Sequence, residues 1–463
     1  MNTSSVKDHP EVRKLWWITL VIQSTFGFTK GLYLYIYGPY LYESFGGSAN
    51  AKTAMLLSTI WFAIQNATIA LLEVPTGAIA DAIGRVNVVI SSWIARVLFF
   101  LCLAAIWLCS SVVTAFTWAV LASLFFSLSY TLFNGAFSAW CVETLKEKAP
   151  HVSYGWLVSR FYSYQSFSVI LGGIISVLLH IHGGSVIAFS MAAIFSFCCM
   201  GYCMYQMREV KSLSFLKTDQ VQFATITKRI GEIIGRGTQA CAKTPVLFWI
   251  VLTYGSYMFL LNLVVYLWPV YFQTKFSGTH AFGRTWVLIV VGSQLLSTLS
   301  SRLLVKLNHR WSIKNGAQSH LAGFRRIFVA TALFSSVSII ALSLDTAFHK
   351  INVFIFPAAV IVVMFSFGII GPCFETLINA YIPPEDSQER ATIMSAGSML
   401  RSLLILILAV PSGGSSGENS PVHWAIPAVL LLLATIFANF FMKQETKQRE
   451  IINNPSVAQL NKA

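Results

Sequence analysis

The chain consists mainly of long, continuous stretches of apolar residues separated by short polar segments. A transmembrane helix needs ~20 mostly apolar residues, and most of these stretches reach that length. The apolar residues do not alternate with polar ones as in a β-strand, so the pattern predicts helices and not a barrel. We predict twelve membrane-spanning helices, at about residues 15–37, 55–80, 86–108, 113–141, 154–179, 185–207, 246–272, 286–307, 324–344, 353–381, 391–410 and 424–442.

The polar segments divide these spans into two sets of six. Residues 208–244 are basic and contain no long apolar run. We therefore predict an N-terminal six-helix bundle over 1–207, a basic cytoplasmic linker over 208–244, and a C-terminal six-helix bundle over 245–442. The polar tail, residues 443–463, is expected to be disordered.

Composition agrees with an integral membrane protein. Hydrophobic residues make up 56% of the chain and charged residues 11%, whereas a soluble domain carries roughly 25% charged residues. The N-terminus shows no cleavage pattern, so the first span is expected to be retained as a signal-anchor. Pro39 is expected to end that span, and its aromatic outer half predicts an interfacial belt formed by Tyr33, Tyr35, Tyr37, Tyr40 and Tyr42.

The net charge is +14, and the positions of the basic residues along the chain indicate how the protein is oriented in the membrane. Most Lys and Arg residues fall in the termini and in alternate loops, and the loops on the other side hold only Lys52, Lys275, Arg284 and Lys350. This distribution follows the positive-inside rule and predicts that both termini are cytoplasmic. We interpret the charge as an orienting feature and expect no nucleic-acid partner; a polyanion partner is the alternative.

One short segment joins spans 2 and 3. Its sequence, from Glu73 to Arg85, is EVPTGAIADAIGR, and about five residues from Asp81 to Arg85 remain to turn the chain. Gly84 can supply the bend without a Cβ penalty. Gly77, Asp81, Gly84 and Arg85 stand in a spacing that resembles the signature loop of the major facilitator superfamily of transporters, although Ala82 and Val86 depart from that pattern.

The resemblance extends to the second half of the chain. The segment IPPEDSQERATIMS, residues 382–395, is similar to the family's connection between spans 10 and 11. The basic stretch 308–323 is not a clean copy of the first signature loop. The resemblance implies an all-α fold of twelve helices in two six-helix bundles that transports a solute by alternating access. Six spans, a linker and six spans are also the layout expected of transporters built from repeated halves.

The family implies a role for the charges of the signature loop. In the family the loop arginine pairs with an acid at the end of span 4, and the loop aspartate faces the start of span 11. Carried over, Arg85 pairs with Glu143 and locks the halves together in the outward-open state. Gly77, Asp81, Gly84, Arg85 and Glu143 are therefore the candidates for a conformational switch, and a solvated Glu143 at a helix end is the alternative.

Charged side chains within the spans are the candidates for recognition. A charge in the bilayer costs ~3 kcal/mol on insertion scales, so each needs a partner or a water-filled cavity. The residues concerned are Lys30, Glu73, Arg96, Glu143, Arg160, Arg302, Glu375 and Arg401. Arg302 lies near a cytoplasmic span end and can snorkel. In the family, spans 1, 4, 7 and 10 line the cavity, which makes Lys30 and Glu375 the leading candidates, with Arg96 and Arg401 on flanking helices.

Two interpretations of these charges remain open. An unpaired cation in the cavity would favour an anionic solute of the carboxylate type, siderophore-like compounds included. Internal pairing of Lys30 with Glu375, or of Glu73 with Arg160, would leave no net attraction. Glu73 and Glu375 are also candidates for proton coupling, since a desolvated carboxylate can exchange a proton near neutral pH; alternatively, Glu73 orders the helix break at Pro75.

Polar and aromatic residues on the cavity helices complete the candidate site. The solute-binding candidates are Lys30, Tyr130, Asn134, Phe137, Tyr257, Asn262, Glu375 and Arg401. For each single aromatic or amide residue, helix packing is the alternative role. The cysteines form no evident disulfide framework, and Cys198, Cys199 and Cys203 are interpreted as packing residues. We expect no metal and no cofactor, and His180 and His182 are expected in a solvated external turn.

These features predict a secondary active transporter of a small organic solute, coupled to protons and acting as a monomer in the lipid bilayer of a bacterial cytoplasmic membrane. A multidrug efflux antiporter is one alternative, although span 5 has the glycine pair 172–173 without the proline common in that branch. A non-transporting receptor or scaffold is another. An enzyme is not expected, since no metalloprotease motif and no nucleophile elbow is present.

Overall fold

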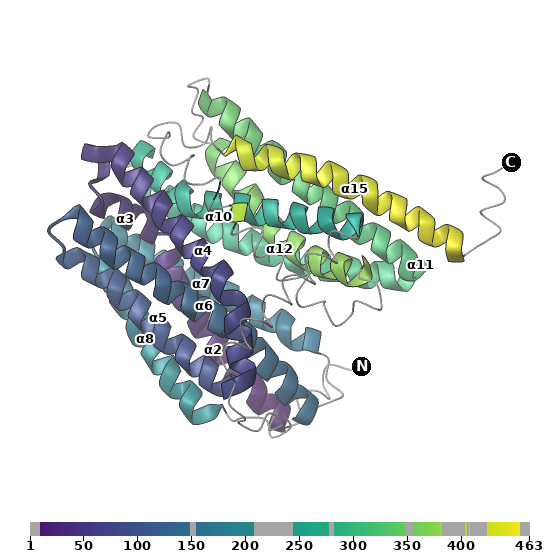
Figure 1. Cartoon of the computed structure of the whole chain (residues 1–463), viewed down its shortest axis with the longest axis horizontal. Coiled ribbons are helices and arrows are strands. Elements are labelled where there is room, and N and C mark those ends of the chain that lie inside the picture. Colours follow the sequence, from purple (N-terminus) through teal and green to yellow (C-terminus); the bar gives the residue numbers. More distant parts are fainter. Residues whose placement is uncertain are drawn as a thin grey trace. The chain divides into compact units, whose positions relative to one another are not determined.

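Every secondary-structure element in the described part of the chain is helical (Figure 1). The computed structural model describes residues 10–148, 154–207, 244–276, 282–347, 355–381 and 424–453, together with 403, 404 and 407. The helices are α2 (Pro10–Leu34), α3 (Tyr37–Ser44), α4 (Ala51–Ile83), α5 (Arg85–Ala105), α6 (Val112–Lys148), α7 (Tyr154–Ile181), α8 (Ser185–Gln206), α10 (Pro245–Phe276), α11 (Phe282–Ala347), α12 (Ile355–Tyr381) and α15 (Ala425–Asn453).

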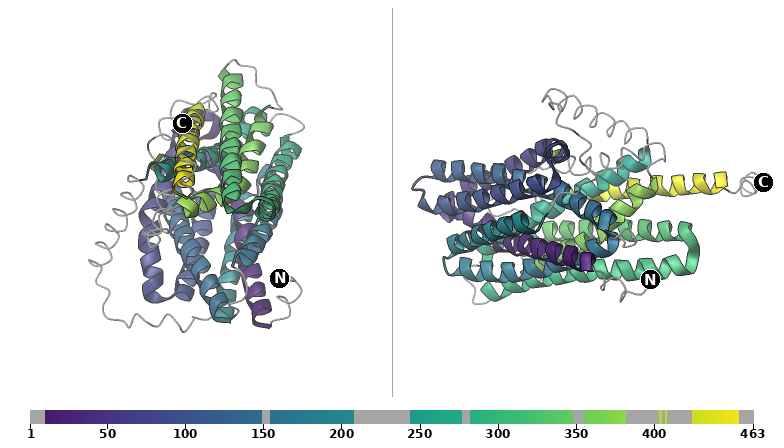
Figure 2. Two further views of the ribbon diagram at one scale, coloured as in Figure 1. Left: turned by 90° about the vertical axis from the view of Figure 1, so that its right-hand side faces the viewer. Right: turned by 90° about the horizontal axis from the view of Figure 1, so that it is seen from below.

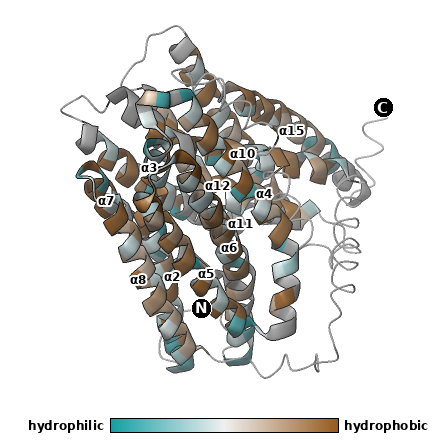
Figure 3. Ribbon diagram, turned by 60° about the vertical axis from the view of Figure 1, so that its left-hand side comes forward, coloured by the Kyte–Doolittle hydropathy of each residue, from teal (hydrophilic) through white to brown (hydrophobic). Residues whose placement is uncertain are grey.

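Ten segments of these helices are long and apolar enough to cross a membrane. Apolar residues dominate the helical ribbons (Figure 3). The ten correspond to predicted spans 2–10 and 12; α2 matches span 1 in position but is less apolar. Span 11 lies almost wholly outside the described residues, so the count of twelve and the orientation of the termini stay predictions.

The first and last spans differ from their predicted limits. Helix α2 already ends at Leu34, and Pro39 lies in the first turn of α3, where its missing N–H costs no helical hydrogen bond. Pro39 therefore does not end span 1. At the other end of the chain, α15 continues to Asn453, so the prediction of disorder is wrong for residues 443–453. The Thr446 hydroxyl on this extension lies 3.3 Å from the Tyr381 hydroxyl, which attaches it to α12.

Helix α11 contains predicted spans 8 and 9 in one helical run of 66 residues. Ser300 donates to the carbonyl of Phe365 and Ser335 donates to Ser366, at 2.9 and 2.8 Å. At 1.5 Å per residue, a straight helix would separate the two serines by ~50 Å. Both reach neighbouring residues of α12, so the chain reverses its direction between them, as Figure 2 shows.

The helices form two compact units. Unit 1 comprises residues 1–230, 265–295 and 405–420, and unit 2 comprises 231–264, 296–404 and 421–463. All of α2 to α8 therefore belongs to unit 1. The predicted linker, 208–244, lies outside the described residues except for Thr244. The proposed domain limits stay a prediction.

Close packing of α2 against α7 shapes unit 1. A Cβ atom at Gly27 or Gly31 would collide with the carbonyl oxygen of Gln165 or Val169, and one at Gly172 with that of Phe28. Glycines allow two helix backbones to approach in this way, and small residues mark such contacts in membrane proteins. The glycine pair of span 5 thus has a packing role, because its first member faces α2.

We expect Gly31→Ala to destabilise the protein. The added methyl group meets the backbone of α7 at Val169 and at Gly173, and overpacking against backbone costs about 1–3 kcal/mol. Gly201→Ala is the matched control, because a Cβ atom there meets nothing within 4 Å. Thermal unfolding of the purified protein should show a Tm several degrees lower for Gly31→Ala only. Equal Tm values for the two variants would contradict the packing role.

Candidate functional site

The signature segment turns the chain at a single residue. Helix α4 runs to Ile83 and α5 begins at Arg85, so the prediction of a five-residue turn is wrong. Gly84 has φ +96° and ψ 146°, a conformation that is almost restricted to glycine. Gly77 and Asp81 lie on the last turns of α4. The contacts of these two residues are not among those that the structure describes. The motif is therefore a helix end, a glycine hinge and a helix start.

The ion pair predicted from the family resemblance is present. Arg85 Nη2 lies 3.6 Å from Glu143 Oε1, and the two side chains are 17% and 22% exposed. Glu143 Oε2 is shielded from solvent, so Glu143 is not a solvated carboxylate at a helix end. The pair joins the first residue of α5 to the last turns of α6. A second pair, Lys148 Nζ to Glu11 Oε2 at 3.0 Å, joins the same end of α6 to α2.

Arg96 lies deep in unit 1 and reaches from α5 to α2. Its side chain is 3% exposed. Its Nε donates to Thr29 Oγ1 at 3.1 Å, and its Nη2 donates to the Phe26 carbonyl at 3.3 Å. Its guanidinium carbon lies 4.1 Å from the centroid of the Phe26 ring, a cation–π geometry. Arg96 was predicted only to flank the cavity, and the sequence held no signal for these partners on α2.

Lys30 follows Thr29 on α2 and is partly buried. Its neighbour Thr29 accepts the hydrogen bond from Arg96, so the two cations belong to the same contact between α2 and α5. The ion pairs found among the described side chains are Arg85–Glu143 and Lys148–Glu11. Neither deep cation, within that part of the chain, lies in ion-pair distance of an acidic side chain. The alternative partners, Glu375 for Lys30 and Arg160 for Glu73, have side chains outside the described set.

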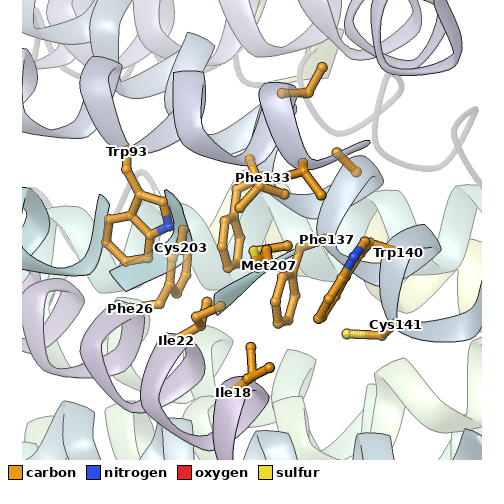
Figure 4. Close-up of a cluster of buried hydrophobic side chains, with 14 of the residues drawn as sticks. Ile18, Ile22, Phe26, Trp93, Phe133, Phe137, Trp140, Cys141, Cys203 and Met207 are labelled. Carbon is orange, nitrogen blue, oxygen red and sulfur yellow. The ribbon is translucent and has the colours of Figure 1, made fainter. Parts of the chain in front are cut away.

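A row of stacked aromatic rings begins at Phe26, which lies under Arg96, and continues along α6 toward Glu143. Figure 4 shows its members Phe26, Phe133, Phe137 and Trp140. Phe26 stacks on Phe133 at 4.4 Å between centroids, Phe133 on Phe137 at 5.0 Å, and Phe137 on Trp140 at 6.2 Å. These rings belong to the apolar core formed by α2, α5, α6 and α8. Phe137 is 1% exposed, so it packs within this core, and a contact with solute stays a prediction for it.

The other solute-binding candidates occupy varied surroundings. Tyr130 is partly buried beside Phe126, and Asn134 is exposed. In unit 2, Tyr257 is fully buried and its hydroxyl donates to the Val363 carbonyl at 2.8 Å. Asn262 Nδ2 donates to the Met258 carbonyl of its own helix at 2.6 Å. Their roles as solute contacts stay predictions.

The remaining candidates are acids and one cation. Glu73 is partly buried on α4, and its Oε2 is shielded from solvent. Glu375 lies on α12 with its side chain outside the described set, and Arg401 lies outside the described residues altogether. The structure therefore brings together Lys30 and Arg96, and Arg85 and Glu143, among the predicted charges.

Two predictions about the outer ends of the spans are wrong. The tyrosines expected in an interfacial belt, Tyr33, Tyr35, Tyr37, Tyr40 and Tyr42, are all less than 9% exposed. Tyr35, for instance, accepts a hydrogen bond from Gln294 of α11 at 2.8 Å. His180 is also buried, with Nδ1 2.7 Å from Ser185 Oγ. The prediction of a solvated turn is therefore wrong for His180, whereas His182 is exposed in the turn as predicted. Packing by neighbouring helices, which hydropathy does not describe, encloses the buried side chains.

A family model for the Major Facilitator Superfamily matches residues 19–409. The chain belongs to this superfamily. It is therefore an integral, multi-pass membrane protein of a family of solute transporters, and the predicted all-α membrane fold of this superfamily is confirmed. The signature residues and the Arg85–Glu143 pair lie within the matched range.

Solved structures agree with this assignment of the fold. The chain is similar to a mutant of the nucleoside transporter NupG, with 13% identity, a TM-score of 0.63, and coverage of 93% of this chain and 99% of that one. A D-xylose-proton symporter has 12% identity, a TM-score of 0.63 and coverage of 92% and 97%. The human organic anion transporter MFSD10 (TETRAN) has 14% identity, a TM-score of 0.58 and coverage of 93% and 99%. No curated protein matches the chain in sequence.

The two ion pairs of α6 should differ in strength. We expect a double-mutant cycle with Arg85→Gln and Glu143→Gln to give a coupling free energy of about 0.5–1 kcal/mol, since the pair is mostly buried. Lys148→Gln and Glu11→Gln form the matched cycle. That pair is 43% and 47% exposed, so its coupling should be smaller. Denaturant unfolding measures both; an additive Arg85–Glu143 cycle would show that the contact contributes nothing.

Proposed function

We propose that this protein is a secondary transporter that carries a small organic anion across the membrane by alternating access. The observation that supports the anionic solute is the pair of deep cations in unit 1, Lys30 and Arg96. Each lies within the helical unit, and neither has an acidic partner among the described side chains. Two neighbouring positive charges in an apolar interior attract a negative group and disfavour a cationic solute.

The two cations have different parts in this proposal. Arg96 is held by Thr29, the Phe26 carbonyl and the Phe26 ring. It therefore contributes a fixed positive charge. Lys30 has a flexible side chain and can move its ammonium group toward a solute carboxylate. We assign Lys30 as the direct contact and Arg96 as the residue that reinforces the positive potential beside it.

The switch and the coupling follow from other residues. Gly77, Asp81, Gly84, Arg85 and Glu143 would form and break contacts between the alternating states, with Arg85–Glu143 present in the conformation described. Glu73, whose Oε2 is shielded from solvent, is the proposed proton carrier together with Glu375. Carboxylates within membrane-spanning helices are the groups that form proton relays in transporters.

The similar structures support a transporter but do not select the solute. They include a nucleoside transporter, a D-xylose-proton symporter and an organic anion transporter. At 12–14% identity this likeness concerns the fold alone. The preference for an anion rests on Lys30 and Arg96, and a carboxylate is the simplest group that pairs with them. A bacterial cytoplasmic membrane and a monomeric state remain part of this proposal.

Loss of Lys30 should weaken anion binding. A panel of mono-, di- and tricarboxylates is screened by thermal shift on the purified protein, and the Kd of the best ligand is then measured. We expect Lys30→Ala to raise this Kd about 10- to 100-fold, because a charge-assisted contact contributes about 1.5–3 kcal/mol. Lys30→Arg should retain most of the affinity, and Lys52→Ala, at an exposed position, should leave it unchanged. An unaltered Kd in Lys30→Ala would exclude the recognition role.

Proton coupling is tested in proteoliposomes with the same carboxylate. A pH gradient should stimulate uptake by the wild type. We expect Glu73→Gln to abolish this stimulation but to retain exchange of internal for external solute, since exchange needs no net proton movement. Wild-type uptake that does not respond to the gradient would remove the coupling role from both Glu73 and Glu375.

A further inference from the structure

Three helices of unit 2 meet at Thr446 of α15. Arg325, on the second arm of α11, donates from Nη1 to Thr446 Oγ1 at 3.5 Å. The hydroxyl of Tyr381, the last residue of α12, lies 3.3 Å from the same oxygen. Thr446 in turn donates to the Met442 carbonyl at 2.7 Å. A guanidinium and two hydroxyl groups therefore converge at this end of the unit.

Arg325 is poorly satisfied there. A distance of 3.5 Å is the outer limit of a hydrogen bond. Its Nε is shielded from solvent and has no acceptor among the described atoms. Arg85 of unit 1 also follows a chain reversal and has the Glu143 carboxylate as its partner. Within the described part of unit 2, Arg325 forms no ion pair, although Glu445 precedes the Thr446 that it contacts.

Exposed apolar stripes on α11 and α15 lead to the same end. On α11 the exposed positions beyond Arg326 recur every three or four residues: Ala330, Phe334, Val337, Ala341 and Leu344. On α15 they are Ile426, Val429, Leu433, Ile436, Phe437 and Phe440, and Lys443 follows. Stripes of this kind on a membrane protein face lipid acyl chains. Arg326 and Lys443 are exposed where the stripes stop, near the ends of the candidate spans Leu321–Leu344 and Ala425–Thr446. Cations at span ends are expected to reach lipid headgroups.

We propose that Arg325, Arg326 and Lys443 bind the headgroup phosphate of an anionic phospholipid. A guanidinium matches two phosphate oxygens at once, and Arg325 has no ion-pair partner in the described part of unit 2. The Thr446 and Tyr381 hydroxyls lie beside it as further polar contacts. Arg325, Arg326 and Lys443 are three cations, and Glu445 is the acid beside Thr446, so these residues together carry a net positive charge. The apolar stripes favour a lipid over a soluble phosphate, because they hold the acyl chains beside the cations.

This site is separate from the proposed solute site, since all its residues belong to unit 2 and the deep cations belong to unit 1. Its test therefore needs no transport measurement. Purified protein in a neutral detergent is titrated with phosphatidylglycerol or phosphatidylcholine, and retained lipid is counted by native mass spectrometry. We expect the wild type to retain phosphatidylglycerol at least about fivefold more strongly than phosphatidylcholine.

The variants separate this site from general surface charge. Arg325→Gln and Arg326→Gln should each reduce retention of phosphatidylglycerol about fivefold, as expected for one basic residue near an anionic lipid. Lys148→Gln, which removes an exposed charge from unit 1, should not change it. Arg326→Gln keeps the test valid if Arg325→Gln fails to fold, because Arg326 is exposed.

Equal retention of the two lipids by the wild type, or an equal loss in Lys148→Gln, would overturn the proposal. Full displacement of the lipid by millimolar inorganic phosphate would also overturn it, in favour of a soluble anion.

Discussion

The burial of positive charge in an apolar helical bundle is the constraint on which unit 1 depends. Removing a guanidinium from water costs several kcal/mol unless other polar groups replace the water. For Arg96 the replacement comes from a hydroxyl, a backbone carbonyl and an aromatic face, without a carboxylate among the described side chains. The charge is therefore solvated by dipoles, but its positive potential is not cancelled. This difference allows a buried arginine to be stable and still to attract an anion.

Helix α5 carries both this cation and one partner of the ion pair at the signature segment. Arg85 begins α5 and Arg96 lies about three turns later, ~16 Å along the axis. Helix α6 carries Glu143, the partner of Arg85, and the stacked rings Phe133, Phe137 and Trp140 on the turns that precede Glu143. A relative movement of α5 and α6 would therefore change both the ion pair and the aromatic packing under the cation. This arrangement gives a physical connection between the surroundings of Arg96 and the Arg85–Glu143 pair.

Glycine positions set the distance at which these contacts are possible. Gly27 and Gly31 bring the backbone of α2 against α7, and the same stretch of α2 carries Phe26, Thr29 and Lys30. The groups that touch Arg96 therefore belong to a helix that is held in place by backbone contact. Unit 2 is organised differently around Arg325, whose described hydrogen bond is to the hydroxyl group of Thr446.

Local sequence features were enough to establish the class of fold, the limits of most spans to within a few residues, and the place of the Gly84 turn. Through the family resemblance, they also identified the partner of Arg85. These features depend on the length of an apolar run, the backbone freedom of glycine and a short motif. Tertiary packing was needed to show that Arg96 reaches α2, that the tyrosines after Leu32 are enclosed, that α11 reverses and that α15 extends to Asn453. Each of these depends on which helix covers which face, and hydropathy along one helix carries no information about the helix that packs against it.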